Sequence, residues 1–223
     1  MKIVIINGSA RKGNVLTAID AFQKGAAAGN DIEIIQPDQL HIAPCKGCGA
    51  CQCYKGCVDK DDTNATIDQI VSADMIVFAT PVYWWGMSAQ LKQVIDKCYC
   101  RGMQLKGKKT GLIVVGGSPV DNIQYELIRK QFDCMADYLS WDMLFQKSYY
   151  ATARDDLQKN MEALEELEQL ANGEEVFENM VVTMKQLSED EKIRMQCEAR
   201  EDYERCLITE YNAGKQDGIE LER

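Results

Sequence analysis

The cysteine spacing in residues 44–62 is the feature of this sequence with the clearest capacity for chemistry. The segment reads PCKGCGACQCYKGCVDKDD and holds five of the ten cysteines of the 223-residue chain. Four of them, Cys45, Cys48, Cys51 and Cys57, follow the spacing C-x2-C-x2-C-x5-C. Thiolates this close together can converge on one centre only if the backbone turns tightly, and the interspersed glycines permit such turns. The spacing therefore predicts a metal or metal-cluster site.

Three states of this segment are compatible with its cysteines. Zinc binds four thiolates tetrahedrally, but structural zinc usually uses two separated C-x2-C pairs. Three evenly stepped cysteines followed by one more are closer to the ligand spacing of [4Fe–4S] clusters. Free thiols without a metal are the third alternative, and Cys53 inside the segment could compete as a ligand. Cys98 and Cys100 lie two positions apart on a predicted helix, so they are interpreted as core or surface thiols.

A glycine- and hydroxyl-rich loop, NGSARKGN, follows the first predicted strand. Residues 2–6 form a β-branched apolar run that is typical of a buried parallel strand. The backbone N–H groups at the start of the next helix, the Ser9 hydroxyl and the Arg11 guanidinium together would cradle a phosphate. The loop also contains Gly13 and Asn14, and it matches neither the dinucleotide nor the nucleoside-triphosphate motif. The alternative is a capped turn with a surface arginine.

Two more loops could contribute to a binding site. Residues 81–88, PVYWWGMS, offer aromatic side chains that suit a flat heterocycle, although a tryptophan ring could instead close the core. Residues 116–120, GGSPV, contain glycines that let the main chain approach a ligand, or they form a simple strand-to-helix turn. His41 is the only histidine, and no paired carboxylates lie near these loops. The sequence therefore predicts no acid–base catalytic side chain.

Strand and helix patterns alternate along the chain, and this order predicts how the loops meet. The alternation indicates an α/β fold, a three-layer doubly wound sandwich with parallel strand order 2-1-3-4-5. Ligands bind such sheets beyond the carboxyl ends of the strands, where the strand order reverses, so the three loops should meet there. The predicted strands are 2–6, 31–36, 74–80, 110–117 and 142–149, and the predicted helices are 15–29, 63–72, 89–101, 121–139 and 154–172.

Residues 174–223 extend beyond what this fold requires, so the predicted domain is 1–173 followed by an acidic helical extension. The net charge of −10 comes from residues 151–223, because residues 1–150 are nearly neutral. Without a basic face, nucleic acid is excluded as a partner. No apolar run approaches the ~18 residues of a membrane span. Ten cysteines without a secretory signal predict a reducing, cytoplasmic location. Apolar stripes in the extension predict a homodimer or homotetramer.

Three segments together resemble the NADPH-dependent FMN reductase branch of the flavodoxin-like proteins. They are NGSARKGN, the cysteine segment and TPVYWWGMSAQLKQVIDK, and the resemblance covers about residues 1–150, with the helix at 154–172 completing the fold. The compact cysteine pattern more narrowly resembles the iron-sulfur flavoproteins of anaerobes. The resemblance implies a flavodoxin-like fold, FMN as cofactor, a cysteine-bound [4Fe–4S] cluster, and NAD(P)H or a redox protein as electron donor.

The resemblance also implies roles for individual residues. Ser9, Arg11 and Asn14 would bind the FMN phosphate, and Val15 stands where the family often has a threonine, so one phosphate hydroxyl is missing. The chain would be an FMN-dependent oxidoreductase that passes electrons to a cluster or another acceptor. The alternatives are a non-enzymatic electron carrier, a flavin reductase without a cluster, and a zinc-bearing module without flavin. The isoalloxazine ring would lie against Pro81, Val82, Tyr83, Trp84 and Gly86 on one side and Gly116, Gly117 and Ser118 on the other.

Overall fold

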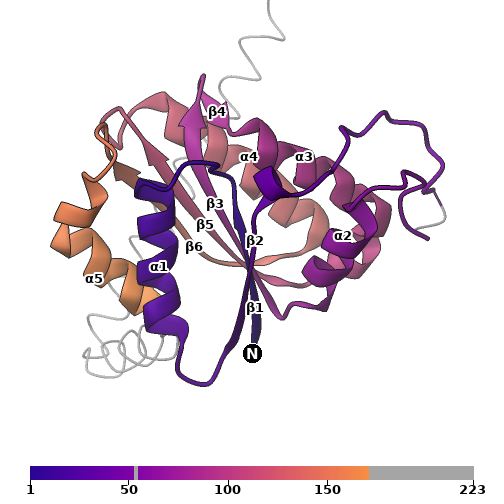
Figure 1. Cartoon of the computed structure of the whole chain (residues 1–223), viewed down its shortest axis with the longest axis horizontal. Helices are drawn as coiled ribbons and strands as arrows, with labels where there is room; N and C mark the ends of the chain where they lie inside the picture. Colours follow the sequence, from indigo (N-terminus) through magenta and orange to yellow (C-terminus); the bar gives the residue numbers. More distant parts are fainter. Residues whose placement is uncertain (53–54, 171–223) are drawn as a thin grey trace, which may run out of the picture. The chain divides into compact units, whose positions relative to one another are not determined.

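A parallel β-sheet forms the centre of the computed structural model, which describes residues 1–52 and 55–170. Its strand order is β2-β1-β3-β5-β6, and the two-residue strand β4 pairs antiparallel with β3 off that path (Figure 1). The predicted order 2-1-3-4-5 is confirmed, with β5 and β6 as the fourth and fifth parallel strands. Cys53 and the predicted extension 174–223 lie outside the described residues. The strands are β1 (Lys2–Asn7), β2 (Asp31–Ile35), β3 (Met75–Tyr83), β4 (Gly86–Met87), β5 (Lys109–Gly116) and β6 (Asp142–Tyr150).

Helices cover both faces of the sheet, with α1 and α5 on one face and α2, α3 and α4 on the other (Figure 1). The predicted helix 154–172 begins later than expected. The Asp156 carboxylate accepts hydrogen bonds from the N–H groups of Thr152 (2.9 Å) and Ala153 (2.6 Å), which stabilises a turn there instead. The helices are α1 (Asn14–Ala26), α2 (Thr63–Ser72), α3 (Ala89–Cys98), α4 (Ile123–Leu139) and α5 (Met161–Leu170), with 3-10 turns η1 (Pro37–Gln39), η2 (Tyr99–Leu105) and η3 (Leu157–Lys159).

Strand β1 shows why the first apolar run of the sequence becomes a central strand. Successive side chains of a strand point to opposite faces of the sheet. Ile3 and Ile5 enter the core beneath α1 and α5, whereas Val4 and Ile6 enter the core beneath α2, α3 and α4. All four side chains are buried. A strand covered on both faces needs a continuous apolar run, and this arrangement directs its carboxyl end, at Asn7, into the glycine-serine loop.

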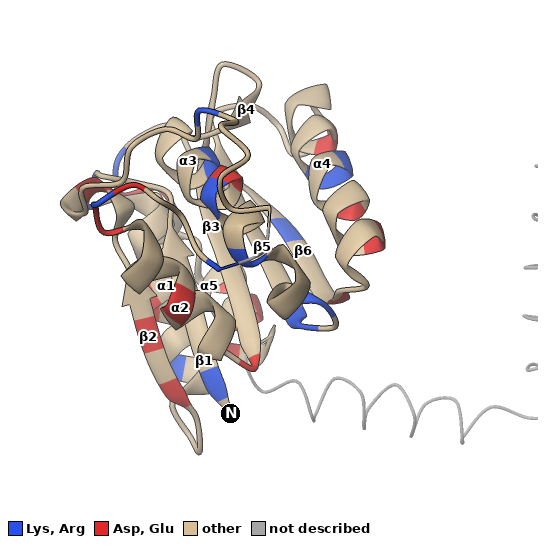
Figure 2. Ribbon diagram, turned by 90° about the vertical axis from the view of Figure 1, so that its right-hand side faces the viewer, with Lys and Arg blue, Asp and Glu red and all other residues tan. Residues whose placement is uncertain are grey.

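Charged side chains of both signs are interspersed on the side of the molecule that carries α2 and α3 (Figure 2). Several form exposed pairs one helical turn apart, such as Lys130 with Glu126 on α4. Such surface pairs contribute little to stability, typically about 0–1 kcal/mol. In the part of the chain that the structure describes, no helix is both long and apolar enough to cross a membrane.

Helices α1 and α5 approach each other closely at Gly25. A Cβ atom at this position would lie 1.9 Å from the main-chain oxygen of Glu168, well inside van der Waals contact. Glycine is thus required by the helix–helix distance, since α5 could accommodate a methyl group only by moving away from the core that it covers.

Replacement of Gly25 by alanine should therefore destabilise the protein. In an ordinary helix interior, alanine is favoured over glycine by about 0.5–1 kcal/mol. Here we expect overpacking to dominate, with a net loss of about 1–3 kcal/mol in the free energy of unfolding measured by urea denaturation. Gly102→Ala is the control, because a Cβ at Gly102 would have no heavy atom within 4 Å. Equal stability of the two variants would contradict this account of the α1–α5 contact.

Candidate functional site

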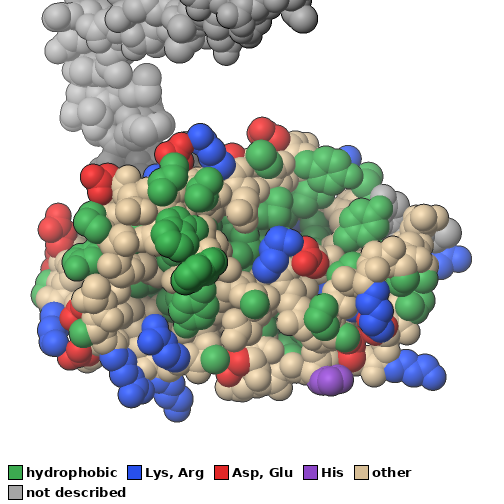
Figure 3. Space-filling view, turned by 90° about the horizontal axis from the view of Figure 1, so that it is seen from above, with side chains coloured by type: hydrophobic (Ala, Val, Ile, Leu, Met, Phe, Trp, Pro, Cys, Tyr) green, Lys and Arg blue, Asp and Glu red, His purple; other side chains and the backbone are tan. Residues whose placement is uncertain are grey.

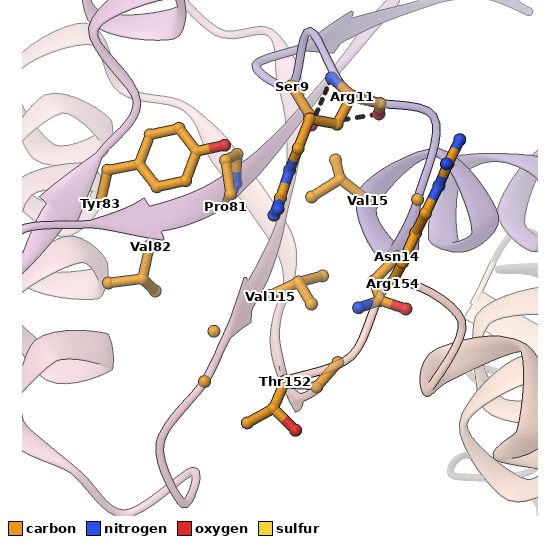
Figure 4. Close-up of a pocket in the computed structure, with 14 residues that line it drawn as sticks. Ser9, Arg11, Asn14, Val15, Pro81, Val82, Tyr83, Val115, Thr152 and Arg154 are labelled. Atoms are coloured by element: carbon orange, nitrogen blue, oxygen red, sulfur yellow. Dashed lines mark hydrogen bonds between the residues drawn. The ribbon is translucent and has the colours of Figure 1, made fainter.

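A cavity of about 230 Å³ opens at the carboxyl edge of the sheet, where the strand order reverses. Four segments line it: the loop from β1 to α1, the end of β3, the end of β5, and the loop that follows β6 (Figure 4). The cavity therefore lies where the loops were expected to meet. Its lining residues are Ser9, Arg11, Gly13, Asn14, Val15, Pro81, Val82, Tyr83, Val115, Gly116, Gly117, Ala151, Thr152 and Arg154.

The β1–α1 loop is held in place by a backbone hydrogen bond to β3 and by the side chain of Ser9. The N–H of Gly8 donates to the main-chain oxygen of Ala79 at 2.7 Å, which ties the loop to β3. The buried Ser9 hydroxyl accepts a hydrogen bond from the Arg11 N–H at 3.3 Å and donates one to the Arg11 main-chain oxygen at 3.3 Å (Figure 4). Helix α1 begins at Asn14, and its N-cap residue, Gly13, supplies no side-chain hydrogen bond. The uncapped helix start and the Arg11 side chain together favour an anion.

The Asn14 side chain is engaged in holding the structure together. Its Nδ2 donates to the main-chain oxygen of Ala153 at 2.7 Å, and its Oδ1 accepts from the N–H of Leu157 at 3.0 Å. These bonds join α1 to the segment after β6. In the same place Arg154 Nε donates to the main-chain oxygen of Lys12 at 2.7 Å. Asn14 thus fixes the geometry of the cavity wall, and Arg154 adds a second guanidinium to the lining.

Four of the lining residues were missed by the sequence analysis: Val115, Ala151, Thr152 and Arg154. Ala151, Thr152 and Arg154 could have been expected here, because they follow the fifth parallel strand. That strand ends at the same edge of the sheet as its neighbours. Arg154 was instead assigned to the start of a helix. Val115 lies beside Gly116 at the end of β5, one position before the predicted loop.

Three predicted residues do not line this cavity: Trp84, Gly86 and Ser118. Trp84 and Trp85 form the tip of the β3–β4 hairpin with φ angles of 50° and 63°, and Trp84 is 91% exposed. Gly86 pairs with Tyr83 in the hairpin, and the Ser118 main-chain oxygen accepts the Tyr125 hydroxyl at 2.7 Å. The structure brings together the remaining predicted residues: Ser9, Arg11, Gly13, Asn14, Val15, Pro81, Val82, Tyr83, Gly116 and Gly117.

A second cavity, of about 320 Å³, is lined by all four motif cysteines. Cys45 and Cys48 are exposed, whereas Cys51 and Cys57 are half-buried. The buried Cys100, from η2, also lines it. Within residues 1–52 and 55–170, no three His, Cys, Asp or Glu side chains converge as a metal site. The structure therefore gathers the thiols around one cavity without forming a coordination shell.

The cysteine loop is shaped by its glycines and closed by α2. Gly47 and Gly49 have φ angles of 63° and 70°, in the left-handed region where a Cβ is disfavoured. Asn64 on α2 clamps the backbone of Cys57, since its Oδ1 accepts from the Cys57 N–H at 2.8 Å and its Nδ2 donates to the Cys57 oxygen at 2.9 Å. The Asp61 carboxylate accepts from the Ala43 N–H at 2.8 Å, which joins the two ends of the loop.

Burial and hydrogen bonds shift several pKa values around this loop. Burial alone would raise the pKa of Asp61, but hydrogen bonds from the Ala43 N–H and from Thr63 lower it to about 2. Burial alone would lower the pKa of Lys97, but hydrogen bonds to Asp59 and Cys57 raise it. Burial raises the pKa of the Cys98 thiol to about 12. Lys97 is thus held as an ammonium group beside the thiol cavity.

We expect Asp61→Asn to lower the free energy of unfolding by roughly 1 kcal/mol at pH 7, because an ionised hydrogen-bond acceptor is lost. Since the folded pKa of about 2 lies below the ordinary value of 3.8, the stabilisation is present above pH 4 and disappears as the pH falls toward 2. Urea denaturation across this range should show the deficit of the variant shrinking. Asp137→Asn, on the exposed face of α4, is the control, and a pH-independent deficit would contradict the prediction.

A family model described as NADPH-dependent FMN reductase matches residues 1–135. The chain belongs to this family. The predicted resemblance to the NADPH-dependent FMN reductase family is thereby confirmed. The matched residues include the glycine-serine loop, the cysteine segment and the ends of β3 and β5.

Several curated relatives are similar to this FMN reductase family member over about half of its length. An iron-sulfur flavoprotein of Methanosarcina thermophila is 35% identical over 123 residues, which cover 53% of this chain and 64% of that protein. An iron-sulfur flavoprotein of Archaeoglobus fulgidus is 37% identical over 119 residues, which cover 52% of this chain and 54% of that protein. The match thus spans less than two thirds of these relatives.

Solved structures confirm the flavodoxin-like fold. An NAD(P)H:quinone oxidoreductase from Methanothermobacter marburgensis aligns with a TM-score of 0.60 at 14% identity, over 76% of this chain and 92% of that chain. A flavone reductase aligns with a TM-score of 0.59 at 22% identity, over 77% of this chain and 60% of that chain. At such identities the likeness concerns the fold alone.

Proposed function

We propose that this member of the family is an iron-sulfur flavoprotein. It would bind FMN in the cavity at the carboxyl edge of the sheet and a [4Fe–4S] cluster on Cys45, Cys48, Cys51 and Cys57. Electrons would enter from NAD(P)H or a redox protein and leave through the cluster or directly to an acceptor. The observation that carries the proposal is the gathering of all four motif cysteines around one cavity in a chain of the FMN reductase family.

The first cavity fits FMN by the chemistry of its lining. The Ser9 hydroxyl, the Arg11 guanidinium and the uncapped start of α1 offer donors and positive charge for the phosphate. The end of β3, with Pro81, Val82 and Tyr83, and the end of β5, with Val115, Gly116 and Gly117, form adjacent walls against which the flat ring system would lie. Ser118 and Gly86 could still reach a bound flavin from beside these walls.

FMN supplies the redox chemistry when bound, and the chain supplies binding, orientation and exclusion of water. The lining of the first cavity contains no carboxylate and no histidine among the described residues. We propose no acid–base role for a side chain of this cavity, because the cofactor would carry the chemistry. The main-chain groups of residues 81–83 and 115–117 would instead fix the edge of the ring by hydrogen bonds.

The second cavity supports a cluster more than zinc. Its four thiols come from one loop with the even spacing of iron-sulfur ligands, and the relatives that match are named iron-sulfur flavoproteins. In a family of FMN reductases, a cluster that transfers electrons would have a function, whereas zinc carries no electrons.

The visible spectrum and metal content of anaerobically purified protein test the proposal. We expect flavin bands, broad absorbance near 400 nm beyond them, and about four irons per chain. Iron at background would remove the cluster from the proposal, and colourless protein would remove the flavin. Anaerobic mixing with NADH and NADPH then separates the reductase from an electron carrier, because only a reductase shows rapid bleaching of the flavin by a nicotinamide.

We also infer a cytoplasmic homo-oligomer. Ten cysteines, four of them in a ligand-like spacing, suit a reducing compartment. Large apolar side chains are exposed on the β3–β4 hairpin and at the start of α4, and apolar groups gather on the face that Figure 3 shows. Such patches often mark interfaces. Light scattering at micromolar concentration should give a dimer or tetramer, and a monomeric mass would refute the inference. The apolar side chains exposed on the hairpin and around the start of α4 are those of Tyr83, Trp84, Trp85, Val120 and Ile123.

A further inference from the structure

Lys97 is a buried lysine that points into the cysteine cavity. It lies near the end of α3, and its side chain is only 2% exposed. Its Nζ donates to Asp59 Oδ2 at 2.6 Å and to Cys57 Sγ at 3.4 Å. The ammonium thus contacts both the fourth cysteine of the motif and the carboxylate two residues later.

The position of Lys97 on α3 is one that packing alone would assign to an apolar residue. Leu91 and Val94 precede it at three-residue intervals on the same buried face of the helix. Burying an ammonium is costly unless it is paired and hydrogen-bonded, and a hydrophobic residue of similar size is often at least as stabilising. Stability therefore does not account for a lysine here, and its contact with Cys57 suggests a role in the chemistry of the thiol cavity.

Asp59 neutralises Lys97 only in part. The Asp59 carboxylate is shared with Lys46, whose Nζ lies 3.4 Å from Asp59 Oδ1 and whose side chain is 68% exposed. Two ammonium groups thus share one carboxylate, and of the two it is Lys97 that is shielded from water and contacts the Cys57 sulfur. The buried cation and its hydrogen bond to sulfur therefore act on the cavity at short range.

We propose that Lys97 is a positioning residue that raises the reduction potential of the cluster held by the four cysteines. The inference rests on the proposed function. The potential of an iron-sulfur cluster depends on net charge, hydrogen bonds to its sulfurs and solvent exposure. A buried ammonium that donates to the Cys57 sulfur adds both a positive charge and a hydrogen bond. Each stabilises the reduced form, which carries one more negative charge, and so eases electron transfer to the cluster.

The test is a redox titration of the anaerobic holoprotein, followed by the electron paramagnetic resonance signal of the reduced cluster. Lys97→Met should lower the midpoint potential, so that the ratio of reduced to oxidised cluster falls at least tenfold at the wild-type midpoint, which is 59 mV for one electron. Lys97→Arg keeps the charge and should stay near wild type. Lys130→Met removes an exposed lysine that lines neither described cavity and should leave the potential unchanged.

A second variant separates charge from structure and keeps the inference testable if Lys97→Met loses its iron. Asp59→Asn removes the negative partner, so the midpoint potential should rise. Opposite shifts in the two variants, or a rise in Asp59→Asn alone when Lys97→Met holds no iron, support the role of Lys97. An unchanged potential in an iron-replete Lys97→Met, or no rise in Asp59→Asn, overturns it and leaves the proposed function standing. Wild-type protein without iron overturns both.

Discussion

Cys48→Ser should reduce the iron content of the anaerobically purified protein from about four per chain to near background, while FMN stays bound. The reason is geometric: Cys48 lines the thiol cavity between two left-handed glycines that set its place in the loop, whereas Cys100, which also lines the cavity, is buried in η2. A serine hydroxyl is a much harder ligand than a thiolate and holds iron-sulfur clusters poorly. Iron and sulfide analysis, together with loss of the absorbance near 400 nm, measures the effect.

Two further cysteine variants serve as comparisons for Cys48→Ser. Cys134→Ser replaces an exposed cysteine on α4 that lines neither described cavity, and it should keep its iron. Cys53→Ser tests the competing ligand in the motif, and we expect iron near the wild-type level. If Cys53→Ser loses iron and Cys48→Ser keeps it, the ligand set is wrong. If all three variants and the wild type lack iron, the thiols serve another purpose.

The order of the strands in the sheet could be predicted because a strand that is buried on both faces is a continuous apolar run in the sequence. The runs that include Ile3–Ile6 and Ile76–Ala79 have no polar alternation, since each side chain enters one of two cores. Helices between such runs require parallel strands and right-handed crossovers. These constraints act along the chain, so one sequence is enough to apply them.

The β3–β4 hairpin could not be predicted, because it depends on contacts between segments. Trp84 and Trp85 adopt left-handed φ angles that bulky side chains seldom favour, and no glycine or asparagine stands at the tip to indicate the turn. The pairing of Val82 with Met87 and of Tyr83 with Gly86 imposes it. Trp84, the tryptophan expected beside the flavin, therefore stands exposed at the hairpin tip and is not among the residues that line the cavity.

The buried cation of the thiol cavity was missed for a similar reason. On sequence alone, Lys97 follows Leu91 and Val94 on an amphipathic helix and resembles a lysine whose stem covers the core while its head reaches water. Only the folded loop brings Cys57 and Asp59 to its ammonium. The cysteines that we propose as ligands could be singled out from their spacing, whereas the contact of Lys97 with one of them was visible only in the folded structure.

Arg11→Gln should weaken FMN binding roughly ten- to hundredfold and leave riboflavin binding nearly unchanged. Arg11 lines the cavity beside Ser9 and the uncapped start of α1, where the phosphate would lie. A hydrogen bond to a charged group contributes about 1.5–3 kcal/mol, and 1.4 kcal/mol corresponds to a tenfold change in Kd. The Arg11 backbone N–H that donates to Ser9 is retained in the variant, so the loop keeps its shape. Fluorescence titration of the apoprotein with both flavins measures the effect.

The comparison of two flavins separates phosphate binding from damage to the loop. Riboflavin lacks the phosphate but keeps the ring system, so a distorted site would lose both ligands together. Lys12→Gln removes the neighbouring positive charge, whose side chain does not line the cavity, and its main-chain oxygen still accepts from Arg154. We expect less than a threefold loss there, as an exposed charge is screened by salt. An equal loss in Lys12→Gln would mean that the phosphate is attracted only by the overall positive charge of the loop. An unchanged Kd in Arg11→Gln would assign the phosphate contact to Arg154 and the start of α1.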